Sequence, residues 1–159
     1  MTKFALPVRC CLLLLFLSVM TAPALAQKRG FGLDAGVSAS PNQFYVGGNI
    51  MAGKVSKDFW FRPSVDIGFG HHVTLVGLNG EFVYLMDLKK SDWTAYFGGG
   101  PVLNIATVHG ISALKNNTDV GGGFNFLGGL RKPHGIFAEI KAGLMDSPDF
   151  RIGVGYTLK

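Results

Sequence analysis

Cysteine is almost absent from this chain of 159 residues, which contains only Cys10 and Cys11. The chain beyond them can form neither a disulfide framework nor a thiolate site for metal or redox chemistry. Charge is scarce as well, because Asp, Glu, Lys and Arg make up 16% of the residues, against about 25% in an average soluble domain. The net charge of +5 is scattered along the chain, which argues against a nucleic-acid partner.

An apolar run long enough to cross a membrane as a helix is also missing. The run from Cys10 to Met20 has about a dozen residues, whereas a spanning helix needs roughly 20. It follows a positively charged start and precedes Ala24-Leu25-Ala26, a small-x-small sequence typical of signal-peptide cleavage. We therefore predict a signal peptide at residues 1–26, removed by signal peptidase, and an exported domain at residues 27–159.

Helical periodicity is the third missing feature, and apolar residues instead alternate with small or polar ones, as they do in strands. All 23 glycines lie beyond residue 27. A glycine-rich β-structure explains them better than disorder, because Phe, Val, Ile and Leu recur at regular spacing. Turn residues divide the region into eight predicted strands: 30–38, 43–53, 59–69, 73–86, 93–104, 120–130, 136–144 and 150–159. We expect Ala106–Asp119 to be the longest connection and Pro63 to mark a strand end or a bulge.

Charged residues indicate which face of each strand points outward. The apolar rows of the eight segments carry no charge, and every strand-borne charge lies on the other row: Asp34, Arg62, Asp66, Glu81, Glu139, Lys141 and Arg151. A basic side chain facing hydrocarbon at mid-depth costs about 2–4 kcal/mol, whereas a soluble barrel has apolar residues inside. The pattern therefore favours a transmembrane barrel with the apolar row toward lipid and the charged row toward the lumen.

Aromatic residues support the same orientation. Seven of them fall at strand ends on one predicted rim, as in an interfacial girdle: Phe31, Phe59, Trp60, Phe61, Tyr84, Trp93 and Tyr156. A soluble exported barrel of the lipocalin type, with the two rows reversed, is the alternative.

The final segment, F-R-I-G-V-G-Y-T-L-K, carries a further signal. Its order of polar Arg151, Gly153, aromatic Tyr156 and hydrophobic Leu158 resembles the C-terminal assembly signal of bacterial outer-membrane barrels. The chain as a whole resembles small outer-membrane proteins of the eight-stranded OmpA/OmpX type. The resemblance implies an all-β, eight-stranded, antiparallel up-and-down transmembrane β-barrel in the bacterial outer membrane. It further implies that the protein is monomeric and contacts outer-membrane lipids and the barrel-assembly machinery.

The charges inside such a barrel predict a plug. Eight strands enclose a space that side chains just fill, and buried charges persist only when they are paired and hydrogen-bonded. We therefore expect the four acids and three bases of the inner row to form an ionic network that closes the lumen, with a structural role.

The sequence gives little evidence for a catalytic or metal-binding site. His71, His72 and His109 belong to loops on one predicted rim, but adjacent histidines rarely chelate one ion well and no carboxylate is suitably spaced. Ser112 lies three residues from His109, with no acid placed beside them. We therefore expect no enzyme activity and no cofactor, and predict a structural or surface-interaction role. A lipid-modifying outer-membrane enzyme remains the alternative within this fold.

Overall fold

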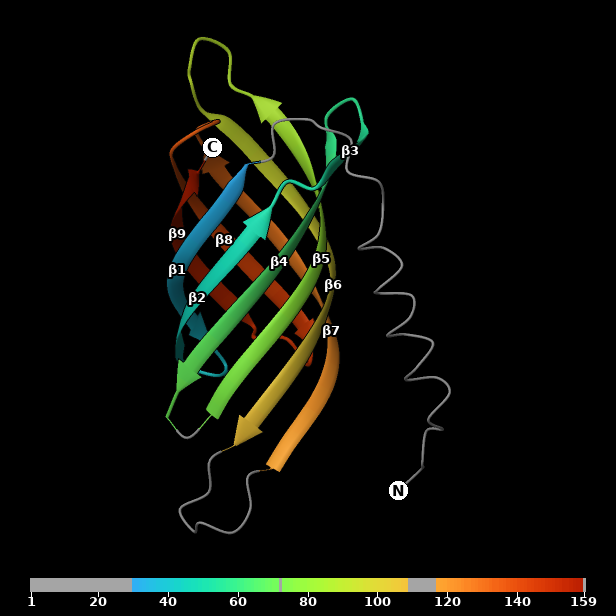
Figure 1. The fold of residues 1–159 in the computed structure, drawn as a ribbon, viewed down its shortest axis with the longest axis vertical. Coiled ribbons are helices and arrows are strands. Elements are labelled where there is room, and N and C mark those ends of the chain that lie inside the picture. The colour runs from blue at the N-terminus through green and yellow to red at the C-terminus, as the bar shows by residue number, and fades with distance from the viewer. Residues whose placement is uncertain (1–29, 72, 109–116, 159) are drawn as a thin grey trace.

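The computed structural model describes residues 30–71, 73–108 and 117–158, and these form a closed barrel (Figure 1). The described residues contain nine strands: β1 (Phe31–Ala39), β2 (Gln43–Ile50), β3 (Gly53–Ser56), β4 (Phe59–Gly70), β5 (Val73–Asp87), β6 (Thr94–Val108), β7 (Asn117–Arg131), β8 (Ile136–Met145) and β9 (Phe150–Leu158). Neighbouring strands are antiparallel, and pairing of β1 with β9 closes the barrel. β2 and β3 pair with successive parts of β4, so together they occupy one strand position in the wall. The nine strands therefore form an eight-stranded barrel. The predicted fold class is confirmed, whereas the predicted signal peptide lies outside the described residues.

The predicted second strand, 43–53, is wrong as a single element. It is interrupted at Met51 and Ala52, after which β3 resumes the pairing with β4. Ala52 donates a backbone hydrogen bond to the carbonyl of Phe61 at 2.9 Å. Residues two apart in a strand direct their backbone groups to the same side, so the nitrogen of Pro63 on β4 also faces the interruption. Proline has no N–H to donate there. Pro63 therefore lies inside β4, opposite the break in its partner strand.

The connection expected over Ala106–Asp119 is shorter than predicted. β6 and β7 stay paired from Thr94↔Arg131 to Val108↔Asn117, and residues 109–116 lie outside the described part. The alternation of apolar residues underestimates the length of both strands. Thr107 and Thr118 interrupt that alternation, but they pair directly with each other, and threonine is favoured in strands.

The two ends of the barrel differ in what they carry. We call the end where β1 begins and β9 ends the terminal rim; it also carries residues 51–58, 88–93 and 132–135 (Figure 1). The opposite end, which we call the hairpin rim, carries residues 40–42 and 146–149, the ends of β4 and β6 and the beginnings of β5 and β7.

The outer wall of the barrel is apolar. Side chains of the predicted outer row are exposed around the whole barrel, including Leu33, Val37, Phe44, Phe69, Phe97, Phe126, Ile140 and Val154. Aromatic rings pair across neighbouring strands near the terminal rim, with centroids 5.1 Å apart for Phe61 and Phe82 and 5.5 Å apart for Tyr84 and Phe97.

One member of the predicted aromatic girdle faces the other way. Trp60 packs with Leu85 against a small apolar cluster of Met51, Val83, Tyr96 and Leu127 inside the barrel. Its inward orientation follows from its place between the outward residues of β4, so the girdle does not include it.

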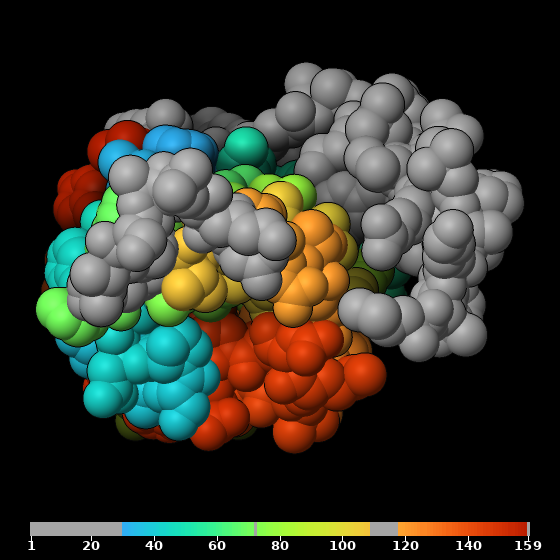
Figure 2. Space-filling view, turned by 90° about the horizontal axis from the view of Figure 1, so that it is seen from below, coloured from blue at the N-terminus to red at the C-terminus, as the bar shows by residue number. Residues whose placement is uncertain are grey.

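The turn between β8 and β9 folds into the hairpin rim. Met145 has a left-handed backbone with φ of 64°, and the next residues run inward, leaving Ser147 and Pro148 buried. Glycines make the room: a Cβ at Gly143 would meet the carbonyl oxygen of Pro148, and one at Gly123 would lie 3.0 Å from the Ser147 Cβ. Viewed from this end, the β8–β9 turn (red-orange) lies beside the β1–β2 turn (cyan) in Figure 2.

Candidate functional site

Four charged side chains form the centre of the lumen. Arg62 on β4 faces Glu81, its cross-strand partner on β5, and donates to the Glu81 Oε2 from Nε at 3.0 Å and from Nη2 at 2.6 Å. Its third nitrogen, Nη1, reaches across the barrel to the Glu139 Oε2 on β8 at 2.6 Å. Lys141 donates to the Glu81 Oε1 at 2.7 Å and lies 3.4 Å from the Glu139 Oε1. Two acids and two bases thus link opposite walls.

A second group extends the network toward the hairpin rim. Asp66 accepts hydrogen bonds at Oδ2 from Arg151 Nη1 at 2.8 Å and from Asn79 Nδ2 at 2.9 Å. Lys141 Nζ lies 3.8 Å from the same oxygen, which joins the two groups. Asn79 in turn accepts from Asn125 Nδ2 at 2.8 Å. All of these side chains are buried.

The inward turn completes this chain of hydrogen bonds. Ser147 Oγ donates to the Asn125 Oδ1, and Asn104 Nδ2 donates to the backbone carbonyl of Asp146 at 2.7 Å. The polar contents of the lumen therefore hold the β8–β9 turn in place, and the turn covers them at the hairpin rim.

Asp34 is the exception among the seven predicted network residues. The structure joins the other six through ion pairs, but Asp34 makes no ion pair with a described residue. It accepts a long hydrogen bond from Asn49 Nδ2 at 3.5 Å. Gly47 lies between Asp34 and Asp66 in the strand register, so the nearest charged neighbour across the sheet has the same sign.

Three further residues of the lumen are not among the seven predicted network residues. Tyr96 donates its hydroxyl to the Glu139 Oε2 at 2.7 Å, and the Arg62 guanidinium lies 5.4 Å from the centre of its ring. Tyr45 has the Arg151 guanidinium 5.8 Å from its ring centre. Arg131, expected in a turn, is the last residue of β7 and points into the lumen. Alternation along the predicted strands already places Tyr45 and Tyr96 on the inner row, and extending the strand that ends at residue 130 by one residue would add Arg131.

The residues of the predicted C-terminal signal all lie on β9 and divide between its two faces. Tyr156 and Leu158 face outward beside Leu33 and Phe31 of β1. Arg151 belongs to the lumen network, and Gly153 leaves space for Tyr45, whose hydroxyl a Cβ at that position would meet. Each of the four residues therefore contributes to the structure of the closed barrel, independently of any recognition by the assembly machinery.

No family sequence model and no curated protein matches the chain. Its structure is similar to the N-terminal β-barrel domain of Pseudomonas aeruginosa OprF, with a TM-score of 0.61 and 14% identity over 82% of this chain and 96% of that one. It is also similar to neisserial surface protein A, with a TM-score of 0.65 and 14% identity over 82% and 95% of the two chains. The chain has the fold of the small eight-stranded outer-membrane barrels. At this identity the likeness concerns the fold alone.

The side chains of this barrel form no metal centre within its described residues, where no three His, Cys, Asp or Glu side chains gather in a way that could hold an ion. His71 lies in the turn between β4 and β5. His72, His109 and Ser112, the other histidine and serine candidates, lie outside the described part. The described residues also contain no helix long and apolar enough to cross a membrane.

Proposed function

We propose that this protein is an integral β-barrel of the bacterial outer membrane with a closed lumen and a structural, non-enzymatic role. The distribution of charge carries the proposal. Every charged residue of the described strands belongs to the inner row or to a strand end, while the outer row is apolar and exposed. Such a wall suits hydrocarbon, and in water it would leave large apolar patches uncovered.

The closed lumen supports a structural role rather than a transport role. Arg62 and Lys141 bridge opposite walls, and the β8–β9 turn covers the network from one end. An eight-stranded barrel has no room for a water channel once such side chains fill it. Porins, which conduct, use roughly 16–18 strands.

A structural role is also favoured over a surface-interaction role. At the hairpin rim the turn at 40–42 is short and the turn at 146–149 is folded inward. These two connections offer little projecting surface to a protein partner; residues 109–116, between β6 and β7, lie outside the described part. The partners we propose are therefore outer-membrane lipids around the wall, with the barrel-assembly machinery and signal peptidase acting during biogenesis.

Membrane extraction tests the location. The protein should stay with the outer-membrane fraction after washing with urea or alkali, and should migrate differently on a gel before and after heating, as compact barrels do. Release into the wash would support the alternative of a soluble lipocalin-like binder. A lipid-modifying activity would instead appear as altered acyl chains in the lipids of cells that express the protein, and would contradict the non-enzymatic proposal.

A further inference from the structure

Arg131 has no acidic partner in the described barrel. Its side chain makes no ion pair or hydrogen bond with any described residue. Asp87 lies on the same inner row, beyond Thr94 in the strand register. Its carboxylate accepts the Thr94 hydroxyl at 2.9 Å, and Arg131 extends the other way, into the mouth of the lumen at the terminal rim.

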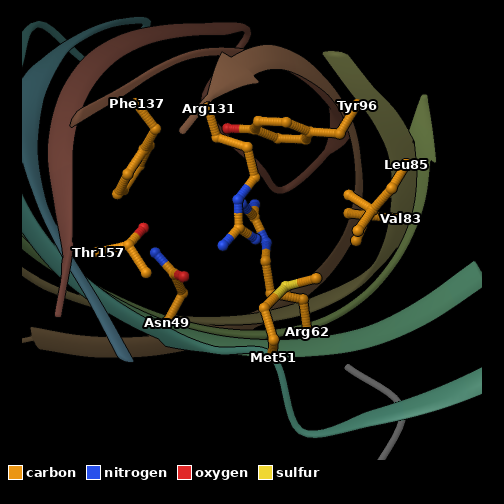
Figure 3. Close-up of a pocket in the computed structure, with 9 residues that line it drawn as sticks. All are labelled: Asn49, Met51, Arg62, Val83, Leu85, Tyr96, Arg131, Phe137 and Thr157. Atoms are coloured by element: carbon orange, nitrogen blue, oxygen red, sulfur yellow. The ribbon is translucent and has the colours of Figure 1, made fainter. Parts of the chain in front are cut away.

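A second guanidinium lies in the same mouth. Figure 3 shows the side chains of Arg131 and Arg62 directed toward each other from opposite walls, around a cavity that both line. Arg62 has its own acids, Glu81 and Glu139, on the side away from the mouth. Like charges at close range repel each other. Two positive groups therefore face one small space, and of the two only Arg62 has acidic partners among the described residues.

The rest of the lining suits a small anion. Asn49 supplies an amide, which has a second N–H besides the one directed at Asp34, and Thr157 supplies a hydroxyl; both can donate to a negative group. The remaining wall is largely apolar, including Met51, Val83 and Phe137, and a wall of low polarity strengthens the attraction between opposite charges. No described residue accepts a hydrogen bond from any of the five side-chain N–H donors of Arg131.

The size of the cavity selects among anions. The space open to the centres of water-sized particles is about 10 Å³, which is room for about one such particle. A monatomic ion fits this space. An anion with several oxygen atoms, such as phosphate, is larger than one water-sized particle.

We propose that Arg131, with Arg62, Asn49 and Thr157, binds a single monovalent inorganic anion of the size of chloride at the terminal mouth of the lumen. The site lies at the mouth of the lumen beside the ionic network, and the anion there pairs with Arg131. It does not depend on the membrane in which the barrel resides, because all of its donors come from the lumen.

Thermal unfolding of the folded protein in detergent micelles tests the site. An anion that binds only the folded state raises the unfolding temperature in a saturable way. Chloride should do so at constant ionic strength. The variant Arg131→Gln should lose the effect, with an apparent affinity roughly ten- to a hundredfold lower, which corresponds to losing a charged hydrogen-bond donor. Lys132→Gln is the matched control, because Lys132 is the next residue but lies over the Trp93 ring, 5.2 Å from its centre, and not among the residues that line the cavity.

Three results would overturn the proposal. The first is an equal chloride effect in Arg131→Gln, and the second is no saturable effect in the unmodified protein. The third is stronger stabilisation by phosphate than by chloride, which would exclude a monatomic site. If Arg131→Gln does not fold, crystals of the unmodified protein soaked in bromide decide the matter. An anomalous peak between Arg131 and Arg62 supports the site, and its absence refutes it.

Discussion

Arg62 and Glu81 are direct cross-strand partners, and Arg62 donates to a single Glu81 oxygen, Oε2, from both Nε and Nη2. This geometry leaves the Glu81 Oε1 free to accept from Lys141 at 2.7 Å. Both oxygens of the Glu81 carboxylate therefore accept hydrogen bonds from basic side chains, and the Glu81 side chain has no exposed surface. A carboxylate shared in this way connects three strands of the wall, β4, β5 and β8.

Removing the charge of Glu81 should therefore destabilise the barrel strongly. We expect Glu81→Gln to lower the free energy of unfolding by about 3–5 kcal/mol, because Arg62 and Lys141 would be left buried with one carboxylate fewer. Urea unfolding in lipid vesicles measures the loss. Asp34→Asn is the control, since Asp34 makes no ion pair with a described residue, and it should cost less than about 1 kcal/mol. Equal losses for the two variants would contradict the central role of Glu81.

A charge on the outer wall should block insertion. Ile140 lies in the middle of β8 between Gly128 and Ile152, with half of its surface exposed. We expect Ile140→Arg to cost about 2–4 kcal/mol if the residue lies at the bilayer midplane. Folding yield into vesicles is the measurement, and Ile140→Val is the control that keeps an apolar side chain at the same depth. Equal yields would show that this face does not meet lipid.

The inward β8–β9 turn should depend on Gly143. This position is on the lumen row but has no space for a side chain, because a Cβ there would meet the Pro148 carbonyl oxygen. We expect Gly143→Val to cost about 1–3 kcal/mol through overpacking and to unseat the turn. Gly122→Ala is the control, since nothing lies within 4 Å of a Cβ at that position.

Conductance in planar bilayers gives a second readout of the same turn. The unmodified protein and Gly122→Ala should carry no steady current, and Gly143→Val should show intermittent openings. Large ohmic currents from the unmodified protein would show that the lumen is a pore rather than a plug.

Loss of the closing strand should prevent assembly. Tyr156 and Leu158 pair with the beginning of β1, and a chain without residues 150–158 would expose the edges of β1 and β8 in lipid. Each unsatisfied backbone group there costs several kcal/mol. We expect this deletion and Tyr156→Asp to remove the protein from the outer membrane, as measured by its level in the membrane fraction. Thr157→Ser, which changes the neighbouring lumen residue conservatively, should assemble normally, and normal levels of the deletion would refute the prediction.

Much of the barrel follows from the sequence alone, and the reason is the period of two. A strand places successive side chains on opposite faces, so alternation by itself separates the row that carries Asp34, Glu81 and Arg151 from the row that carries Ile140 and Val154. The expense of a charge in hydrocarbon then assigns the two rows to lumen and lipid. The turn residues divide the sequence into eight segments, and these give the number of strand positions around the barrel.

Other features required the tertiary structure, because they depend on distances across the barrel. The pairing of Arg62 with Glu139 joins residues 77 positions apart, and alternation says which face each occupies but not which partner it meets. The exclusion of Asp34 from the ion pairs arises from strand register, which sets it across Gly47 from another acid.

The inward β8–β9 turn and the charge of Arg131 at the lumen mouth belong to the same class. Asp146-Ser147-Pro148-Asp149 reads as an ordinary turn, and only the glycines of two neighbouring strands, Gly123 and Gly143, create the space that it enters. From the sequence, Arg131 belongs to a turn. In the structure it pairs with Thr94 at the end of β7, and this position lies on the inner row. Local sequence determines the face of a strand residue, whereas its neighbours across the lumen are determined by how the closed sheet is staggered.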